Sequence, residues 1–168
     1  MSTGSQTRDD VFEILDEVMD PEVPVLSVVE LGIVRDARIE AGGVTVTITP
    51  TYSGCPAMRV IEEEITAALV ARGLSPVRLE TVYAPAWTTD WMSAEAKRKL
   101  QEYGIAPPGR SQQESLVTLT RASAVERFRC PYCGSHDTTL RSEFGSTACK
   151  SICYCNHCQQ PFEAFKSL

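Results

Sequence analysis

The sequence predicts an α+β fold, with a small mixed three-stranded sheet and helices on one face, plus a C-terminal all-β zinc ribbon. Three observations predict it: apolar residues alternate with threonines over residues 44–49, helical spacing begins at Met58, and two Cys-x-x-C pairs lie near the C-terminus. We therefore expect an α+β domain over residues 1–106, a linker and joining strand over 107–127, and a ribbon domain over 128–168.

Composition describes a soluble globular protein. The chain has 168 residues, of which 43% are hydrophobic and 23% charged, and its net charge is -6. No apolar run approaches the ~20 residues that span a bilayer, and the polar start lacks a signal-peptide core. We therefore expect a cytoplasmic protein without membrane contact. Seven cysteines in such a protein are better explained by metal or redox chemistry than by disulfides.

The first helix is expected over residues 11–18, where apolar side chains recur at helical spacing. Asp10 is the expected N-cap, and Glu13, three residues on, would complete a capping box. The Asp20-Pro21 pair should end the helix, because a proline cannot continue it.

A hairpin and a crossover helix should follow. A strand over residues 33–39 turns at 40–43 into the strand that begins at Val44. The helix that begins near Met58 should end at Gly73, and apolar alternation over residues 77–83 predicts a third strand. This order, with a crossover helix before the last strand, predicts a mixed sheet.

Cys55 stands at the junction of the second strand and this helix. Pro56 suits the first helical position, which would place Cys55 at or beside the N-cap. The positive end of a helix favours an anion there, so the thiolate would form readily and could serve as a nucleophile, a metal ligand or a persulfide carrier. The alternative is a buried cysteine that acts as a small hydrophobe.

Both tryptophans lie in an irregular segment, residues 84–92. We expect Trp87 and Trp91 to cover the small core, with each indole N–H bonded at its edge. The alternative is a docking anchor for a partner protein. A third helix should follow, with Ser93 as its cap and Gly104 at its end.

The connection to the tail is expected to be a stiff linker over residues 105–110, IAPPGR in sequence. Residues 116–120 resemble a strand that could belong to either domain.

The tail carries two Cys-x-x-C knuckles separated by 21 residues, which a hairpin of residues 138–144 and 149–154 would span. Four thiolates suit a tetrahedral zinc ion, which would contribute folding free energy to so small a domain. A single iron ion or an iron–sulfur cluster is the alternative metal centre. The expected ligands are Cys130, Cys133, Cys155 and Cys158.

The remaining tail cysteines and both histidines have weaker interpretations. Cys149 and Cys153 are either core residues or a pair that exchanges metal. His157 lies inside a knuckle, where the turn should direct it to solvent, and His136 is a weak substitute ligand.

Other function classes receive little support. A nucleic-acid-binding ribbon is disfavoured by the acidic total and by the lack of a Lys/Arg run. No set of nucleophile, base and orienting group is evident, so we expect a non-catalytic protein. The basic residues of the tail region are Arg127, Arg129, Arg141, Lys150 and Lys166.

Several segments together resemble the SufT-like family of iron–sulfur assembly proteins: residues 20–24, 30–34, 51–56 and 87–92. The tail, through residues 144–150 and 161–166, resembles one branch of it, the accessory subunits of bacterial phenylacetyl-CoA epoxidase systems. The resemblance covers nearly the whole chain from the first helix onward. Two positions depart from the family pattern: Glu30 stands where an aspartate is expected, and Cys153 occupies a position not usually cysteine.

This resemblance implies an accessory role in aerobic phenylacetate degradation, in which the chain helps to mature or insert an iron–sulfur or di-iron centre of an epoxidase component. The implied partners are the other epoxidase components, above all the flavin reductase with its 2Fe–2S cluster. Cys55, with Asp20 or Glu22 nearby, would handle iron or persulfide, and the four tail cysteines match the metal ligands. The alternative is an iron-containing electron-transfer component that takes part in turnover.

Overall fold

The computed structural model describes residues 6–40, 42–52, 54–109 and 128–167. The chain divides into two compact units. The first contains the residues up to Trp87 together with 91–93, and the second contains 88–90 and the residues from Ala94 onward. The helix that follows the tryptophan segment thus belongs to the unit that carries the tail.

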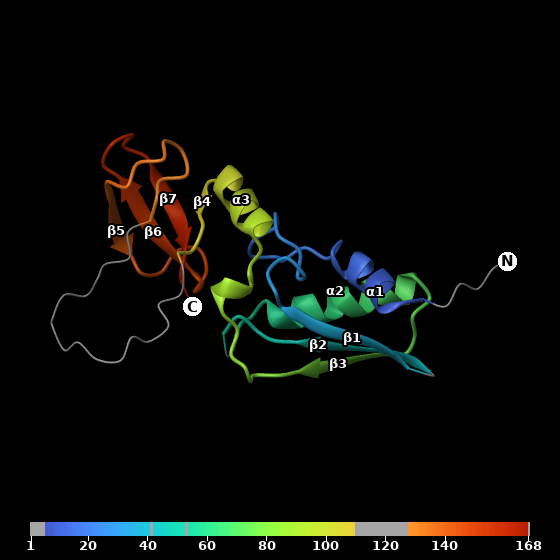
Figure 1. Cartoon of the computed structure of the whole chain (residues 1–168). Coiled ribbons are helices and arrows are strands. Elements are labelled where there is room, and N and C mark those ends of the chain that lie inside the picture. Colours follow the sequence, from blue (N-terminus) through green and yellow to red (C-terminus); the bar gives the residue numbers. More distant parts are fainter. Residues whose placement is uncertain (1–5, 41, 53, 110–127, 168) are drawn as a thin grey trace. The chain divides into compact units, whose positions relative to one another are not determined.

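The first unit is a mixed three-stranded sheet with two helices on one face (Figure 1). The strands follow the order β1-β2-β3; β1 and β2 are antiparallel, and β2 and β3 are parallel. The expected order of helix, strand, strand, helix, strand is therefore confirmed. The elements are α1 (Arg8–Leu15), β1 (Val34–Glu40), β2 (Gly43–Ile48), α2 (Met58–Ala71) and β3 (Val77–Thr81).

The core of this unit lies between the sheet and the helices. Along β2, buried residues alternate with half-buried ones, as expected for a strand with one face inward. The side chains that α2 buries are spaced four residues apart, on one side of the helix. The inward-facing residues are Val44, Val46 and Ile48 on β2 and Ile61, Ile65 and Leu69 on α2.

The predicted cap of α1 is wrong. Thr7 is the N-cap, and its hydroxyl accepts the backbone N–H of Asp10 at 3.3 Å, while Asp10 accepts the backbone N–H of Thr7 at 2.7 Å. Asp10 is therefore the third helical residue of a capping box, not its cap. The helix also ends earlier than predicted, at Leu15, with Asp16 as its C-cap.

The helix α2 begins at Met58 as predicted, but the roles predicted for Pro56 and Cys55 at its start are wrong. The N-cap is Ala57 and the helix begins at Met58, so Pro56 does not hold the first helical position. Cys55 lies two residues before the cap, in a turn where its carbonyl accepts the Met58 N–H at 3.3 Å. It therefore does not present its sulfur to the helix from the capping position.

The second unit contains a four-stranded sheet in the order β4-β7-β6-β5. Strands β5, β6 and β7 are antiparallel neighbours, and β4 is parallel to β7. A short helix, η1 (Thr89–Trp91), contains residues of both units and precedes the longer helix α3. The remaining elements are α3 (Ala94–Tyr103), β4 (Ile105–Ala106), β5 (Thr138–Ser142), β6 (Lys150–Cys155) and β7 (Pro161–Phe165).

The tail hairpin is confirmed as β5 and β6. Ile105 and Ala106, which were expected in a linker, instead form β4 and pair with Glu163 and Ala164 of β7. Residues 110–127, which include the predicted strand at 116–120 and Arg127, lie outside the described residues. Within the described residues, none of the helices has both the length and the apolar character that crossing a membrane requires.

Candidate metal centre

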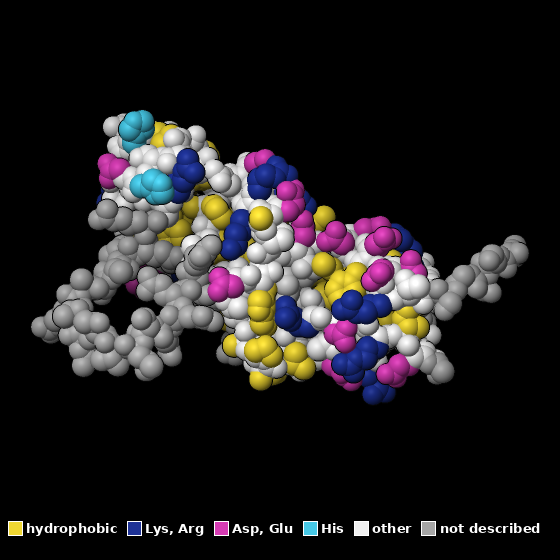
Figure 2. All heavy atoms as spheres, viewed as in Figure 1, with side chains coloured by type: hydrophobic (Ala, Val, Ile, Leu, Met, Phe, Trp, Pro, Cys, Tyr) yellow, Lys and Arg dark blue, Asp and Glu magenta, His cyan; other side chains and the backbone are white. Residues whose placement is uncertain are grey.

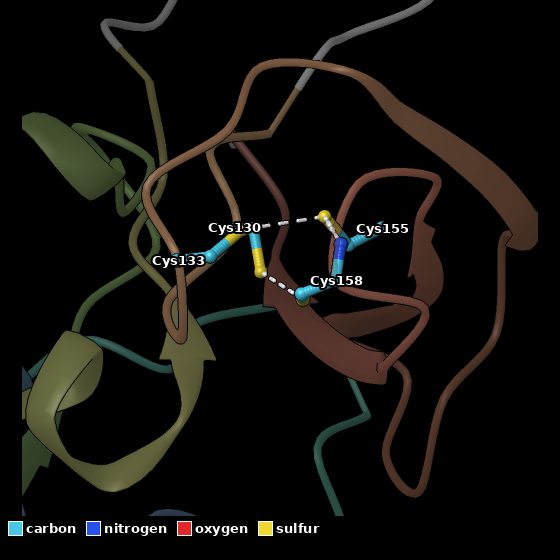
Figure 3. Close-up of side chains that lie close together, drawn as sticks. All are labelled: Cys130, Cys133, Cys155 and Cys158. Atoms are coloured by element: carbon cyan, nitrogen blue, oxygen red, sulfur yellow. Dashed lines mark hydrogen bonds between the residues drawn. The ribbon is translucent and has the colours of Figure 1, made fainter.

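Four cysteine side chains of the second unit converge on one point (Figure 3). All four Sγ atoms lie within 4.8 Å of one another. The Sγ atoms of Cys130 and Cys158 are 3.6 Å apart, and those of Cys133 and Cys155 are 3.5 Å apart. The structure thus brings together the four residues that the spacing singled out.

This arrangement fits a tetrahedral metal ion. A Zn–S bond of about 2.3 Å implies sulfur atoms about 3.8 Å apart at the corners of a tetrahedron. The two closest sulfur pairs, at 3.5 and 3.6 Å, are near that separation. A metal bound there would cross-link the two knuckles. Four cysteines can also bind a single iron ion, so the ligand set alone does not distinguish iron from zinc.

The two knuckles repeat one backbone geometry. In each, the N–H of the first cysteine donates to the carbonyl five residues on: Cys130 to Ser135 at 2.9 Å and Cys155 to Gln160 at 3.0 Å. The residue after each second cysteine has a positive φ, 75° at Gly134 and 60° at Gln159. Two equivalent turns therefore hold the ligand pairs, which explains why the Cys-x-x-C spacing predicted them.

Electrostatics at the cluster favour a cation. The backbone N–H groups of Cys158 and then His157 lower the pKa of Cys155 to about 6. Burial raises the pKa of Cys158 to about 12, because it disfavours the charged thiolate. Four thiolates in so small a volume would also repel one another unless a positive ion offset their charge. A metal ion at the centre would stabilise all four thiolates.

The core beside the cluster is small. It includes two of the four cysteines themselves, and Ala106 contributes to it from β4. A core this small is expected to need a further cross-link, which a bound metal would provide. The buried members are Ala106, Phe128, Cys130, Cys153, Cys155, Phe162 and Ala164.

The other tail candidates are resolved as follows. Cys153 is 1% exposed within this core, so its interpretation as a core residue is confirmed. Cys149 is also buried, and its sulfur lies 3.1 Å from the hydroxyl of Thr147. His136 and His157 are exposed, and neither joins the four-cysteine cluster. Of the residues that the structure describes, only those cysteines form a group of three or more candidate ligands.

The candidate residues of the first unit have a different setting. Asp20 is buried, and its Oδ1 accepts the backbone N–H groups of Glu22 at 2.8 Å and Val23 at 2.7 Å. These bonds shape the loop and account for the burial of the carboxylate. Cys55 is half-buried, and its N–H donates to the carbonyl of Tyr52 at 3.3 Å. A shared role of Cys55, Asp20 and Glu22 in handling iron or persulfide stays a prediction.

The tryptophans differ from each other. Trp87 is 5% exposed and its Nε1 donates to the carbonyl of Leu31 at 2.9 Å, so its predicted core role is confirmed. Trp91 is half-buried, and the guanidinium of Arg35 lies 3.6 Å from the centre of its ring. The alternative role, docking of a partner, therefore stays a prediction that suits Trp91 better than Trp87.

Both units match known families. Residues 8–75 match the family described as iron–sulfur cluster assembly protein, and residues 114–166 match the PaaD zinc beta ribbon domain. The first match contains Asp20, Glu22 and Cys55, and the second contains all four clustered cysteines.

Individual proteins match the chain over different lengths. An Escherichia coli protein, named as a putative subunit of 1,2-phenylacetyl-CoA epoxidase, is 42% identical over 95% of this chain and 92% of its own length. An Fe–S protein maturation auxiliary factor of Porphyromonas gingivalis is 37% identical over 56% of this chain and 91% of its own. A conserved hypothetical protein of Thermotoga maritima has a similar structure, with a TM-score of 0.51 and 34% identity over 60% of this chain and 98% of its own.

Proposed function

Because the chain belongs to the PaaD family of iron–sulfur assembly proteins, we propose that it is an accessory protein of a multicomponent phenylacetyl-CoA epoxidase. In this role it assists the maturation or insertion of an iron–sulfur or di-iron centre in one epoxidase component. The observation that carries the proposal is the similarity to a protein named as an epoxidase subunit, which runs through both units. We propose the cytoplasm as its location, where thiols stay reduced.

The lengths of the matches suggest that the two units have different functions. The P. gingivalis protein, named as a maturation auxiliary factor, matches only about half of this chain, whereas the protein named as an epoxidase subunit matches nearly all of it. The part that the two have in common would supply the assembly function. Because the match to the iron–sulfur cluster assembly family lies at residues 8–75, outside the ribbon, the ribbon would direct that function to an epoxidase component.

Cys55 is the residue we assign to transient handling of iron or persulfide. It is half-buried and lies in the loop before α2, and the four-cysteine cluster does not include it. A thiol that is reachable yet not committed to a resident metal can form and release a bond to cargo. Asp20 and Glu22 belong to the same proposal as neighbouring positions of the family motif.

The ribbon is assigned a resident metal, which we propose to be zinc. The support is the tetrahedral spacing of the sulfur atoms and the match to a zinc ribbon family. Its ligands would be Cys130, Cys133, Cys155 and Cys158. A zinc ion held there stabilises the ribbon and takes no part in electron transfer.

The test compares epoxidase components purified from cells that carry wild-type protein, Cys55→Ser, or no copy of this chain. We expect the iron and sulfide content of the flavin reductase, our proposed client, to fall several-fold in the last two strains, together with epoxidase turnover. Cys149→Ala is the matched control, because it removes a thiol outside both the cluster and the loop. The control should retain full iron and sulfide content.

Two results would overturn the proposal in different ways. Normal metal content in every component of the strain without this chain, with turnover also normal, would remove the maturation role. Normal metal content with lost turnover would instead favour the alternative, an electron-transfer component that takes part in each catalytic cycle.

A further inference from the structure

The first unit carries a groove of about 410 Å³ that none of the functions above uses. Its apolar lining comes from Phe12 of α1, Val29 of the following loop and Trp91. All three are only half-buried, so their side chains are accessible from the groove. Figure 2 shows hydrophobic side chains over the region of α1, with both acidic and basic side chains around them.

The charged side chains that line this groove are all acidic, and Ser93 adds a neutral hydroxyl. Glu13, Asp16 and Glu30 line it, and no Lys or Arg is among its lining residues. Three carboxylates beside an apolar surface create a local negative potential that favours a cationic ligand. The apolar floor would contact the aliphatic part of that ligand.

Two of the carboxylates are held in place by Ser27. Its hydroxyl donates to Oδ1 of Asp16, and its backbone N–H donates to Oε2 of Glu30 at 3.1 Å. The Glu30 N–H in turn donates to the Ser27 hydroxyl at 3.0 Å. Because these bonds fix the carboxylates before a ligand arrives, binding would cost little conformational entropy.

The end of α1 adds to the negative potential. Asp16 is the C-cap of this helix, whose last turn contains no basic residue. The C-terminal end of a helix carries a partial negative charge. A cation placed there interacts with it favourably, whereas a carboxylate interacts with it unfavourably. The fold thus places an acidic side chain at an end that a positive ligand would favour.

The aromatic rings of the groove already contact guanidinium groups. Arg35 lies 3.6 Å from the ring centre of Trp91, and Arg8 lies 4.6 Å from that of Phe12. Arg8 is also paired with Asp36 at 3.1 Å, which holds it outside the lining of the groove. Each ring has a second face, which could stack on another planar cation.

Trp91 is also fixed by its backbone surroundings. Gly32 has a φ of 75°, and a Cβ atom at this position would lie 3.1 Å from the Cβ of Trp91. The close approach of the Gly32 backbone and the stacked Arg35 therefore define where the indole lies. A positioned aromatic side chain contributes contact area at a low cost in side-chain entropy.

We propose that this groove binds an arginine side chain of a partner protein, presented in a segment with apolar neighbours. The guanidinium would form charge-assisted hydrogen bonds with Asp16 and Glu30, and the apolar neighbours would pack on Phe12, Val29 and Trp91. Arginine fits better than lysine because its planar group can both pair with carboxylates and stack on a ring. This inference concerns recognition and does not depend on what Cys55 or the ribbon does.

The test uses the full chain, loaded with metal and labelled with ¹⁵N. The probe is a capped tripeptide with arginine between two leucines, and its control carries citrulline, which has the same shape without the charge. The two indole N–H signals report separately on Trp91 in the groove and on Trp87, which is bonded to Leu31. We expect the arginine peptide to shift the Trp91 signal with saturation and to leave the Trp87 signal in place.

The citrulline peptide should bind at least ten-fold more weakly. The variant Asp16→Asn/Glu30→Gln should weaken arginine binding to a similar extent, because it removes charge but keeps the oxygens that Ser27 contacts. No saturable shift of the Trp91 signal, equal affinity for both peptides, or unchanged binding to the variant would each overturn the proposal. A Trp91 signal that moves with protein concentration alone would mean that a second copy of the chain occupies the groove, and would also overturn it.

If the double variant does not fold, the comparison of the two peptides on the wild-type protein still decides the question. Because no epoxidase component is present in this experiment, its failure would leave the proposal of an iron–sulfur assembly role untouched.

Discussion

The two cysteine-bearing regions of this protein differ in what surrounds each thiol. In the second unit, four cysteines on two equivalent turns converge within 4.8 Å. In the first unit, Cys55 lies half-buried in a loop, and within the described residues it joins no group of three or more candidate ligands. Four converging thiols can hold a resident metal ion, whereas the lone thiol of Cys55 is the one that we propose for transient chemistry.

Loss of one ligand should have the largest effect, and it should be confined to one unit. Cys130→Ser removes a ligand and also a core residue, so we expect the ribbon to lose both its metal and its tertiary structure. Structural zinc sites contribute about 10–16 kcal/mol of apparent binding free energy at pH 7. Metal analysis and amide NMR spectra would measure both losses.

The control for this loss is the first unit, where the signal of Trp87 should stay unchanged. Cys149→Ser, which changes a buried cysteine outside the cluster, should retain the metal. A ribbon that keeps its dispersed amide signals without metal would show that its core is sufficient.

A substitution that creates a cavity in the core of the first unit should have the second largest effect. It should lower the stability of that unit and leave the metal bound to the ribbon. Ile61 is fully buried on α2, so Ile61→Ala should lower the free energy of unfolding by about 2–5 kcal/mol. Val70 on the same helix is 49% exposed, and Val70→Ala should change the free energy of unfolding by less than about 0.5 kcal/mol. Urea unfolding gives the free energies, and zinc content should equal that of the wild type. Loss of zinc in Ile61→Ala would show that the units do not fold independently.

Substitution of Asp20 separates its structural role from its proposed chemical role. Asp20→Ala removes the acceptor of two backbone N–H groups and should cost about 1–3 kcal/mol of stability. Asp20→Asn keeps an acceptor oxygen and should cost less than half as much. If Asp20 helps to handle iron, Asp20→Asn should still lower the iron content of the client, measured as for Cys55→Ser. Full client iron with Asp20→Asn would leave the carboxylate a purely structural role.

The smallest expected effect is a difference in the chemical reactivity of Cys55 and Cys133. In the metal-loaded protein, iodoacetamide should modify Cys55, while Cys133 stays protected although its residue is more exposed. Metal-bound thiolates are poor nucleophiles, so removal of the metal with a chelator should expose Cys133 to labelling. Mass spectrometry of peptides would give the order. Labelling of Cys133 before Cys55 in the loaded protein would mean that the cluster does not hold a metal firmly.

Much of the fold and of the metal site could be predicted from the sequence. The strand at residues 44–49 and the helix from Met58 each bury one face. The spacing of their apolar residues therefore predicts them directly. The Cys-x-x-C spacing predicts equivalent turns because each knuckle closes its own backbone hydrogen bonds. These features are local, and the sequence contains them.

Features that depend on distant contacts were missed. Strand β4 has only two residues and exists through its pairing with β7, more than fifty residues later, so no period could reveal it. Strand β7 (Pro161–Phe165) was not predicted, and its pairing with both β6 and β4 needed the structure. Both Thr7–Asp10 and Asp10–Glu13 have the spacing of a capping box, and only the hydrogen bonds distinguish them. The groove residues come from three separate segments, so their proximity needed the structure.

Metal analysis with a visible absorption spectrum, on protein purified without oxygen, tests directly whether resident and transient chemistry are divided between the two cysteine regions. The proteins to compare are the wild type, Cys55→Ser and Cys130→Ser. We expect one zinc ion per chain and no visible absorption in the first two, and loss of that zinc in Cys130→Ser. Iron with sulfide that persists in Cys55→Ser and disappears in Cys130→Ser would contradict this division, because the ribbon would then hold a redox-active cluster.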